Sequence, residues 1–215
     1  MATTTGGIHG PFVGKVGPIV GSSWKGKFYI KARPKPRKKK RGENEKKNQQ
    51  KFATAHYWLR PIIDFVREGF KNYSDKTEGF NAAKSYALNH AFTQDKNKNH
   101  IFDPSLVLVS YGDLQNPADI EVEKSADDVL LFTWNPKHQP GTTNYDQVML
   151  LAYDDVNENK SMILTGEFRS TGTARLPLYK KPGQKNLEFH IYIAFRAHDR
   201  SRQSNSVYLG KVKVK

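Results

Sequence analysis

The feature that most constrains this chain is a twenty-residue stretch that cannot contribute to a hydrophobic core. Residues 31–50 read KARPKPRKKKRGENEKKNQQ, and apart from two prolines the stretch has only one apolar side chain, Ala32. Ordering a backbone costs about 1–2 kcal/mol per residue, and without apolar burial only a partner can offset that cost. The prolines favour an extended, polyproline-like conformation. We therefore expect an extended basic arm here.

The positive charge of the chain is concentrated in the same region. The 215 residues carry a formal net charge of +14, and the segment from Lys25 to Lys51 supplies +11 of it through thirteen Lys or Arg residues and two Glu residues. A charge block on an otherwise near-neutral chain is typical of an arm that binds a polyanion. Such an arm binds nucleic acid without sequence preference, because each neutralised phosphate releases counterions. The alternatives are an acidic protein surface and a solvated tail that binds nothing.

The stretch WKGKFYIK at 24–31 alternates with period two, which predicts a single strand. One face would pack on protein through Trp24, Gly26, Phe28 and Ile30. The other face would present lysines and a phenol, and the nearby rings of Trp24, Phe28 and Tyr29 could stack on exposed bases. The predicted nucleic-acid-binding residues of this strand and the arm are Lys25, Lys27, Tyr29, Lys31, Arg33, Lys35, Arg37, Lys38, Lys39, Lys40, Arg41, Lys46 and Lys47.

The segments on either side of the arm predict different structures. Residues 1–22 are rich in glycine and proline, which favours extended chain over helix. After the arm, an apolar stripe that runs from Phe52 to Phe70 predicts a helix with a break at Pro61 and an end at Gly69. A second helix is expected from Asn81 as N-cap, with buried positions that include Ala83, Tyr86, Ala87 and His90.

The second half of the chain has the pattern of a β-protein. Seven short, alternating runs are separated by turn residues. In chain order these runs are SLVLVSYGDL, DDVLLFTWNP, YDQVMLLAYDD, SMILTGEFRS, TARLPLY, LEFHIYIAFRAHD and SNSVYLGKVKV. Seven strands in about 110 residues is the size of an immunoglobulin-like sandwich. The position of Trp134 after the second run, and a final hairpin that carries Tyr192 and Tyr208, resemble fibronectin type III domains.

A wider resemblance covers nearly the whole chain. It is carried by GKVGPIVGSSWKGKFYIKARP at 14–34, a glutamine-bearing stretch, a helix that ends in GF, FNAAKSYALNHAF at 80–92 and VLVSYGDL at 107–114. Together these resemble a Bacteroidota family defined by a domain of unknown function and often encoded among phage-like genes. The basic run KPRKKKR at 35–41 departs from the milder linker of that family, which suggests a specialised contact with a polyanion. The resemblance implies no active site.

Several classes of chemistry find little support in the sequence. The chain has no cysteine, which excludes a disulfide framework, thiolate catalysis and cysteine-ligated zinc. We see no signal peptide and no apolar stretch long enough to cross a bilayer. The stretch DKNKNHIFD places Asp95, Asn97, Asn99 and Asp103 at the ligand positions of a calcium loop. It lacks the glycine and the bidentate glutamate of such a loop, so the sequence does not decide whether residues 95–103 bind calcium. We expect no catalytic residue, cofactor or resident metal, and no membrane or small-molecule substrate as a partner.

These observations predict an α+β, mainly β protein in three parts: a glycine-rich segment with the basic arm at 1–51, a helical section at 52–103, and an immunoglobulin-like β-sandwich at 104–215. We expect a non-enzymatic structural or adaptor protein of a phage or phage-like assembly, located in the virion or the cytoplasm. Its arm would contact nucleic acid, DNA or RNA, or an acidic subunit, and its sandwich would contact other subunits. The alternatives are a cellular accessory protein bound to the ribosome or nucleoid, and a surface-binding module that acts through its sandwich loops.

Overall fold

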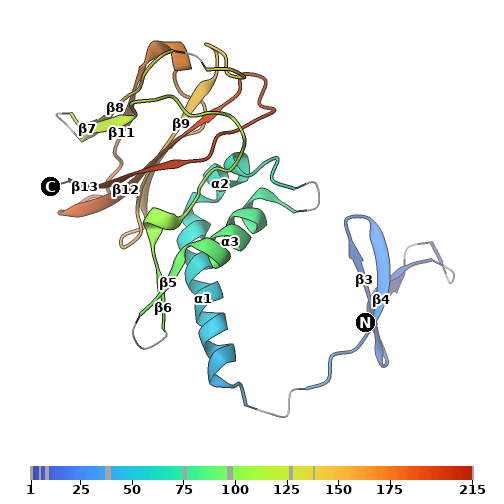
Figure 1. Ribbon diagram of the computed structural model, residues 1–215. Coiled ribbons are helices and arrows are strands. Elements are labelled where there is room, and N and C mark those ends of the chain that lie inside the picture. Colours follow the sequence, from blue (N-terminus) through green and yellow to red (C-terminus); the bar gives the residue numbers. More distant parts are fainter. Residues whose placement is uncertain are drawn as a thin grey trace. The chain divides into compact units, whose positions relative to one another are not determined.

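The computed structural model describes residues 2–4, 6–7, 10–36, 40–74, 77–95, 99–125, 128–137 and 139–214. Contacts within the chain divide it into two compact units, Met1–Gly42 and Glu43–Lys215. The first unit is a four-stranded sheet, and the second combines helices with a four-stranded, a three-stranded and a two-stranded sheet (Figure 1). Among the described residues, no helix has the length and apolar character needed to cross a membrane.

The N-terminal unit is a four-stranded antiparallel sheet with strand order β1-β2-β3-β4. Its strands are β1 (Ala2–Thr4), β2 (Phe12–Val16), β3 (Ile19–Trp24) and β4 (Lys27–Ala32). The alternating stretch at 24–31 is therefore not one strand, as we expected from the sequence. Trp24 ends β3 and is paired with Lys27, so Lys25 and Gly26 form a two-residue hairpin turn. Both turn residues have positive φ, as in a type I′ turn, which glycine adopts readily and lysine rarely does.

Helix α1 (Glu43–Leu59) begins inside the segment that we expected to be extended. Its first turns read ENEKKNQQK, and Glu, Lys and Gln are all good helix formers. Glu43 and Glu45 also lie at the positive end of the helix dipole. Later turns bury Ala55, Trp58 and Leu59, which anchors the polar turns to a packed core. The expectation of an extended chain at 43–51 was therefore wrong.

The rest of the helical section follows the predicted stripe. The chain breaks its helix at Pro61 and ends the next helix at Gly69, as predicted. The third helix begins before Asn81, and His90 at its end is exposed rather than buried. In chain order, the remaining elements of this section are η1 (Arg60–Ile62), α2 (Ile63–Gly69), α3 (Gly79–His90), β5 (Phe92–Gln94), β6 (His100–Phe102) and η2 (Pro104–Leu106).

Seven strands form two antiparallel sheets in the second unit, with orders β11-β8-β7 and β10-β9-β12-β13. The strands, together with the short helix η3 (Arg169–Thr171), are β7 (Glu121–Lys124), β8 (Val129–Thr133), β9 (Gln147–Asp154), β10 (Asn159–Ile163), β11 (Thr173–Pro177), β12 (Leu187–Arg196) and β13 (Val207–Val214). Tyr192 of β12 is paired with Tyr208 of β13, which confirms the predicted final hairpin. The molecule is mostly β, as expected.

The first predicted strand of this half was wrong. Within the fully described stretch 99–125, SLVLVSYGDL has no strand of more than one residue, and its start forms η2. The side chains of Val107 and Val109 pack in the helical core, while the Val109 amide donates to the Ser206 hydroxyl instead of to a strand. The strand that the sequence did not predict is β7. Its sequence, EVEK, gave little signal because only Val122 is directed toward the core.

One hydrophobic core lies between the two sheets. It includes Phe132 of β8 and Trp134, which follows the end of that strand, with Ile193 and Phe195 of β12. The indole N–H of Trp134 donates to the backbone carbonyl of Arg169 at 2.8 Å, and its ring meets Phe195 edge-on. Trp134 is therefore buried in this core, as its position in the sequence suggested.

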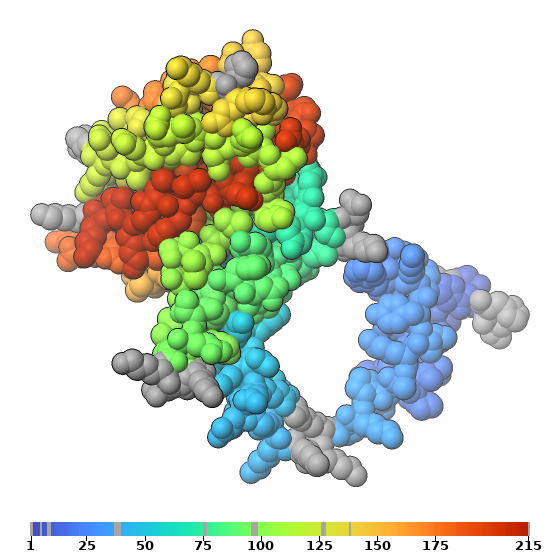
Figure 2. Space-filling view, viewed as in Figure 1, coloured from blue at the N-terminus to red at the C-terminus, as the bar shows by residue number. Residues whose placement is uncertain are grey.

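A second core joins the larger sheet to the helices. Met149, Leu151 and Tyr153 of β9 alternate with the residues of that strand that face the first core, and they pack with the apolar faces of the helices. In the space-filling view, the helical residues in cyan to green and the strands in yellow to red form one packed body (Figure 2). The boundary that we expected near residue 103 therefore does not separate two independently packed cores.

Candidate nucleic-acid interface

The N-terminal unit is uniform in the sign of its charge. Residues 1–42 include eleven Lys or Arg residues and no Asp or Glu. The second unit, by contrast, has twenty-four basic and twenty-one acidic residues, so it is close to neutral. With no carboxylate of its own to neutralise it, the N-terminal unit carries a positive potential that attracts polyanions.

The strand register gathers several of these cations on one side of the sheet. Residues directly opposite each other on antiparallel strands point to the same face. The pairs Lys15 with Val20, Val20 with Lys31, Ser22 with Tyr29 and Trp24 with Lys27 therefore share one face. We call this the basic–aromatic face, and its residues are Val13, Lys15, Val20, Ser22, Trp24, Lys27, Tyr29 and Lys31.

Two aromatic rings lie open on the basic–aromatic face. The exposed fractions of Trp24 and Tyr29 are 60% and 46%. They are diagonal neighbours across the β3–β4 pair, a relation that places residues about 7–8 Å apart. The Lys25 ammonium lies 5.2 Å from the centre of the Trp24 ring, and the Lys31 ammonium lies 5.7 Å from the Tyr29 ring. Cations and open π surfaces are thus interleaved on the face.

The opposite side of the sheet is apolar. It includes Phe12, Val16, Ile19, Phe28 and Ile30, and the side chains of all but Phe12 are exposed. We expected Trp24 to share a buried face with Phe28, and the structure corrects this expectation. The turn at 25–26 reverses the chain, so the side chain of Trp24 lies with the lysines, while that of Phe28 lies on the other face.

The other predicted binding residues lie after strand β4, between Arg33 and Lys47. The Arg33 amide donates to the Pro18 carbonyl at 2.7 Å, which extends the sheet by one bond. Lys35, Lys40 and Arg41 are exposed and have no regular secondary structure. Lys46 lies on α1 in the second unit, so it does not belong to an extended arm. Three predicted residues, Arg37, Lys38 and Lys39, lie outside the described residues.

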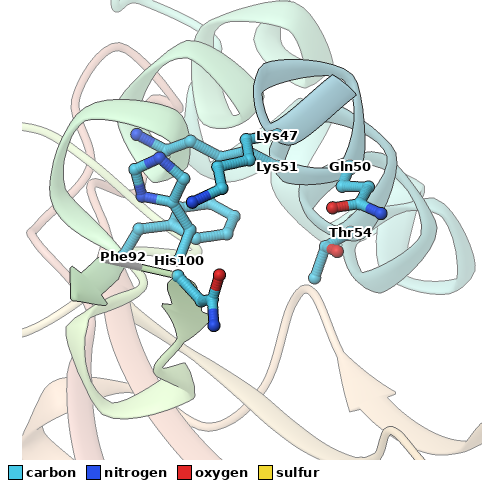
Figure 3. A pocket seen from close by; sticks show the side chains of 7 residues that line it. Lys47, Gln50, Lys51, Thr54, Phe92 and His100 are labelled. Carbon is cyan, nitrogen blue, oxygen red and sulfur yellow. The ribbon is translucent and has the colours of Figure 1, made fainter. Parts of the chain in front are cut away.

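Lys47 also lies on α1, where it lines a small pocket between the helix and the β5–β6 hairpin. The pocket is lined by Lys47, Gln50, Lys51, Thr54, Phe92, Asn99 and His100. Figure 3 shows Lys47 and Lys51 extending from the helix toward the rings of Phe92 and His100. The Lys51 ammonium lies 4.9 Å from the centre of the Phe92 ring. Two ammonium groups beside amide and hydroxyl donors suit an anion such as a phosphate group.

The described residues of the calcium loop considered from the sequence belong to the β5–β6 hairpin and to the start of η2. Asp95 and Asn99 lie where β5 and β6 meet, and Asp95 accepts from the backbone and the side chain of Asn99. Asp103 accepts from the Ser105 amide and hydroxyl and so caps η2. Asn97 lies outside the described residues. Within the described ranges, no three His, Asp or Glu side chains are grouped to hold a metal ion.

Some residues of the candidate interface were missed from the sequence. Lys15 joins the basic–aromatic face only through the register of β2 and β3. Lys51 lines the α1 pocket one helical turn after Lys47, and this i, i+4 spacing was a usable signal. His100 reaches the same pocket from a hairpin whose position relative to α1 could not be read from local periodicity.

One comparison supports part of the resemblance seen in the sequence, namely that the chain is a member of a family of unknown function. A model described as "Family of unknown function (DUF6266)" matches residues 11–210, which is nearly the whole chain. The chain belongs to this family. A search of curated proteins and a search of solved structures found no match.

Proposed function

We propose that this member of the DUF6266 family is a non-enzymatic structural or adaptor protein that binds nucleic acid through its N-terminal unit. The observation that carries the proposal is the charge of residues 1–42, eleven Lys or Arg residues without one carboxylate. Every described lysine and arginine of this unit is exposed. Binding through phosphates alone would be independent of sequence and strongly dependent on salt.

The second unit supplies the structural part of the proposal. We infer an immunoglobulin-like sandwich, because seven strands are divided between a three-stranded and a four-stranded antiparallel sheet with a shared core. The chain crosses between the sheets after β8, β10 and β11, as expected of such a sandwich rather than of two separate meanders. Sandwiches of this type present loops at both ends, and these loops would contact neighbouring subunits.

The setting that we propose is a phage or phage-like particle, where the N-terminal unit would lie against packaged nucleic acid. The resemblance to phage-associated sequences supports this setting. An acidic neighbouring subunit would be an alternative partner for the positive charge of this unit. A protein bound to the ribosome or nucleoid would bind nucleic acid in the same way, but it would not be present in repeated copies within one assembly. Mass spectrometry of purified virions and ribosomes from the host tests the setting, since the proposal predicts the chain in virions.

The binding proposal is tested by salt dependence. The affinity of the full chain for mixed-sequence DNA should fall linearly on a log–log plot against salt concentration. Replacement of Arg37, Lys38, Lys39, Lys40 and Arg41 by Gln removes five charges from the basic run. It should reduce the magnitude of the slope by up to about 4.5 if each contacts one phosphate of a duplex. Fluorescence anisotropy with a labelled duplex measures this slope.

A matched control removes five charges from the second unit. Lys71, Lys124, Lys137, Arg175 and Lys185 are exposed, and their replacement by Gln lowers the net charge by the same amount. The slope should change far less in this control than in the variant of the basic run. Equal slopes in both variants would show that overall charge, and not the N-terminal unit, determines the binding.

A further inference from the structure

We propose that the basic–aromatic face binds single-stranded nucleic acid in preference to duplex, with bases stacked on Trp24 and Tyr29. This inference rests on the proposed function, because it specifies the form of nucleic acid that the N-terminal unit contacts. It adds a second kind of contact to the charge interaction. The lysines would neutralise phosphates, while the two rings would hold bases.

The geometry of the face supports a stacking platform. Trp24 and Tyr29 lie on neighbouring strands whose backbone pairing fixes the distance between them. Lys27 lies beside both rings, since it is opposite Trp24 and two residues from Tyr29 on the same strand. Single-strand-binding proteins use this combination, a positively charged surface that follows the backbone and aromatic rings that stack on successive bases.

The open rings favour single strands over duplex. In a duplex the bases stack on each other, so their π faces are not available to a flat protein surface, and only the lysines could then contribute. Large exposed aromatic side chains would gain little from a duplex backbone, whereas each unpaired base offers a face that matches them. An acidic protein would likewise use the lysines and leave the rings with no matched partner.

The lysines near the rings fit the same mechanism. The Lys25 and Lys31 ammonium groups lie over or beside the rings at 5.2 and 5.7 Å. A base that stacks on one of these rings occupies the space next to the ring face, so each ammonium group must move away from its ring when the base binds. The lysine side chain is long and flexible, and the phosphate next to the stacked base offers it a stronger, charge-assisted contact.

Intrinsic fluorescence of the full chain provides a direct test. The chain has three tryptophans, and the exposed fractions of Trp58 and Trp134 are 6% and 4%, so Trp24 is the tryptophan whose ring is largely exposed. We expect an oligothymidylate single strand to quench the tryptophan emission and to bind more tightly than a duplex at the same salt concentration. Trp24→Leu should abolish the quenching and weaken the binding of the single strand by about 5- to 150-fold.

The matched control lies on the same strand but on the other face. Phe28→Leu removes an exposed ring of the apolar face, so it should leave single-strand affinity and quenching unchanged. Trp24→Phe keeps an aromatic ring and should retain most of the affinity, even if Trp24→Leu were to weaken the hairpin. Neither variant changes charge, so the salt dependence of binding should remain that of the original chain.

The outcomes separate this inference from the proposed function. Equal affinity for single strand and duplex, with salt dependence intact, would overturn the stacking inference and leave the charge-based proposal standing. The same effect from Phe28→Leu and Trp24→Leu would also overturn it. Competition by polyglutamate as effective as that by the single strand would favour an acidic protein partner and overturn it too. Binding to none of these polyanions would overturn both proposals.

Discussion

At the residue scale, Gly21 decides whether the N-terminal sheet can form. A Cβ built on Gly21 would lie 2.1 Å from the Phe12 carbonyl oxygen and 2.6 Å from its ring. The backbone oxygen belongs to the paired strand and cannot move without disrupting the pairing of β2 with β3. Gly21→Ala should therefore abolish amide-exchange protection in residues 12–32 and leave the second unit unchanged. Gly42→Ala is the control, since nothing lies within 4 Å of its added Cβ.

A second residue-scale prediction concerns His190, which is buried in the second unit. Its Nε2 lies 3.7 Å from the Asp155 carboxylate, and its Nδ1 lies 3.0 Å from the Tyr208 hydroxyl. Burial lowers the pKa of His190, and Lys211 lowers it further, while Asp155, Glu188 and Asp154 oppose the shift. The folded state therefore takes up this proton less readily than the unfolded chain does.

The consequence is a loss of stability at mildly acidic pH. Below about pH 6.5 the unfolded histidine becomes protonated while the folded one resists, so the free energy of unfolding should decrease as the pH falls through this range. Urea unfolding at pH 7.5 and at steps below 6.5 measures this dependence. His190→Gln should flatten it, whereas substitution of the exposed His198 by Gln should not. A dependence that is unchanged in the His190 variant would assign the effect to other groups.

At the element scale, local sequence patterns predicted most strands and helices. They did not predict which strands pair with each other, and this pairing decides on which face of a sheet each side chain lies. The segments VLLFT and TARLP form β8 and β11, as expected, and the burial of their residues alternates along each strand. The run at 24–31 also alternates, yet its alternation crosses a turn, which moved Trp24 to the opposite face. The basic residues were visible in the sequence, whereas the basic–aromatic face required the register. Good helix formers at 43–51 gave a helical signal that the charge block obscured.

The strands β9 and β12 carried a signal of another kind. Their sequences QVMLLAYD and LEFHIYIAFR are apolar at consecutive positions, and almost all of these residues are buried. Such runs are typical of strands that are covered on both faces. One face contributes to the core between the sheets, and the other contributes to the core with the helices. The helices therefore share a core with the four-stranded sheet of this unit.

This architecture predicts how fragments behave. A fragment of residues 104–215 would expose Met149, Leu151, Tyr153 and Tyr192, which are buried against the helical section. We expect this fragment to aggregate or to unfold without cooperativity, while residues 43–215 should unfold in one cooperative transition. Denaturant unfolding monitored by tryptophan fluorescence compares the two. A fragment of 104–215 that is as stable as 43–215 would contradict the shared core.

At the scale of the whole molecule, the excess of positive charge lies in one unit and the hydrophobic cores lie in the other. The Met1–Gly42 unit has a small sheet and an excess of positive charge, with few buried side chains. The Glu43–Lys215 unit contains both described hydrophobic cores and a nearly balanced charge. Stability of the fold should therefore depend on the second unit, and affinity for nucleic acid on the first.

The most direct measurement of this division compares the full chain with residues 43–215 in binding the same labelled single strand at low salt. We expect that removal of residues 1–42 lowers the affinity by at least about tenfold and flattens the salt dependence, because the lost lysines and arginines no longer release counterions. Circular dichroism should show that residues 43–215 remain folded. A folded fragment that retains the affinity and the salt slope of the full chain would contradict the assignment of nucleic-acid binding to residues 1–42.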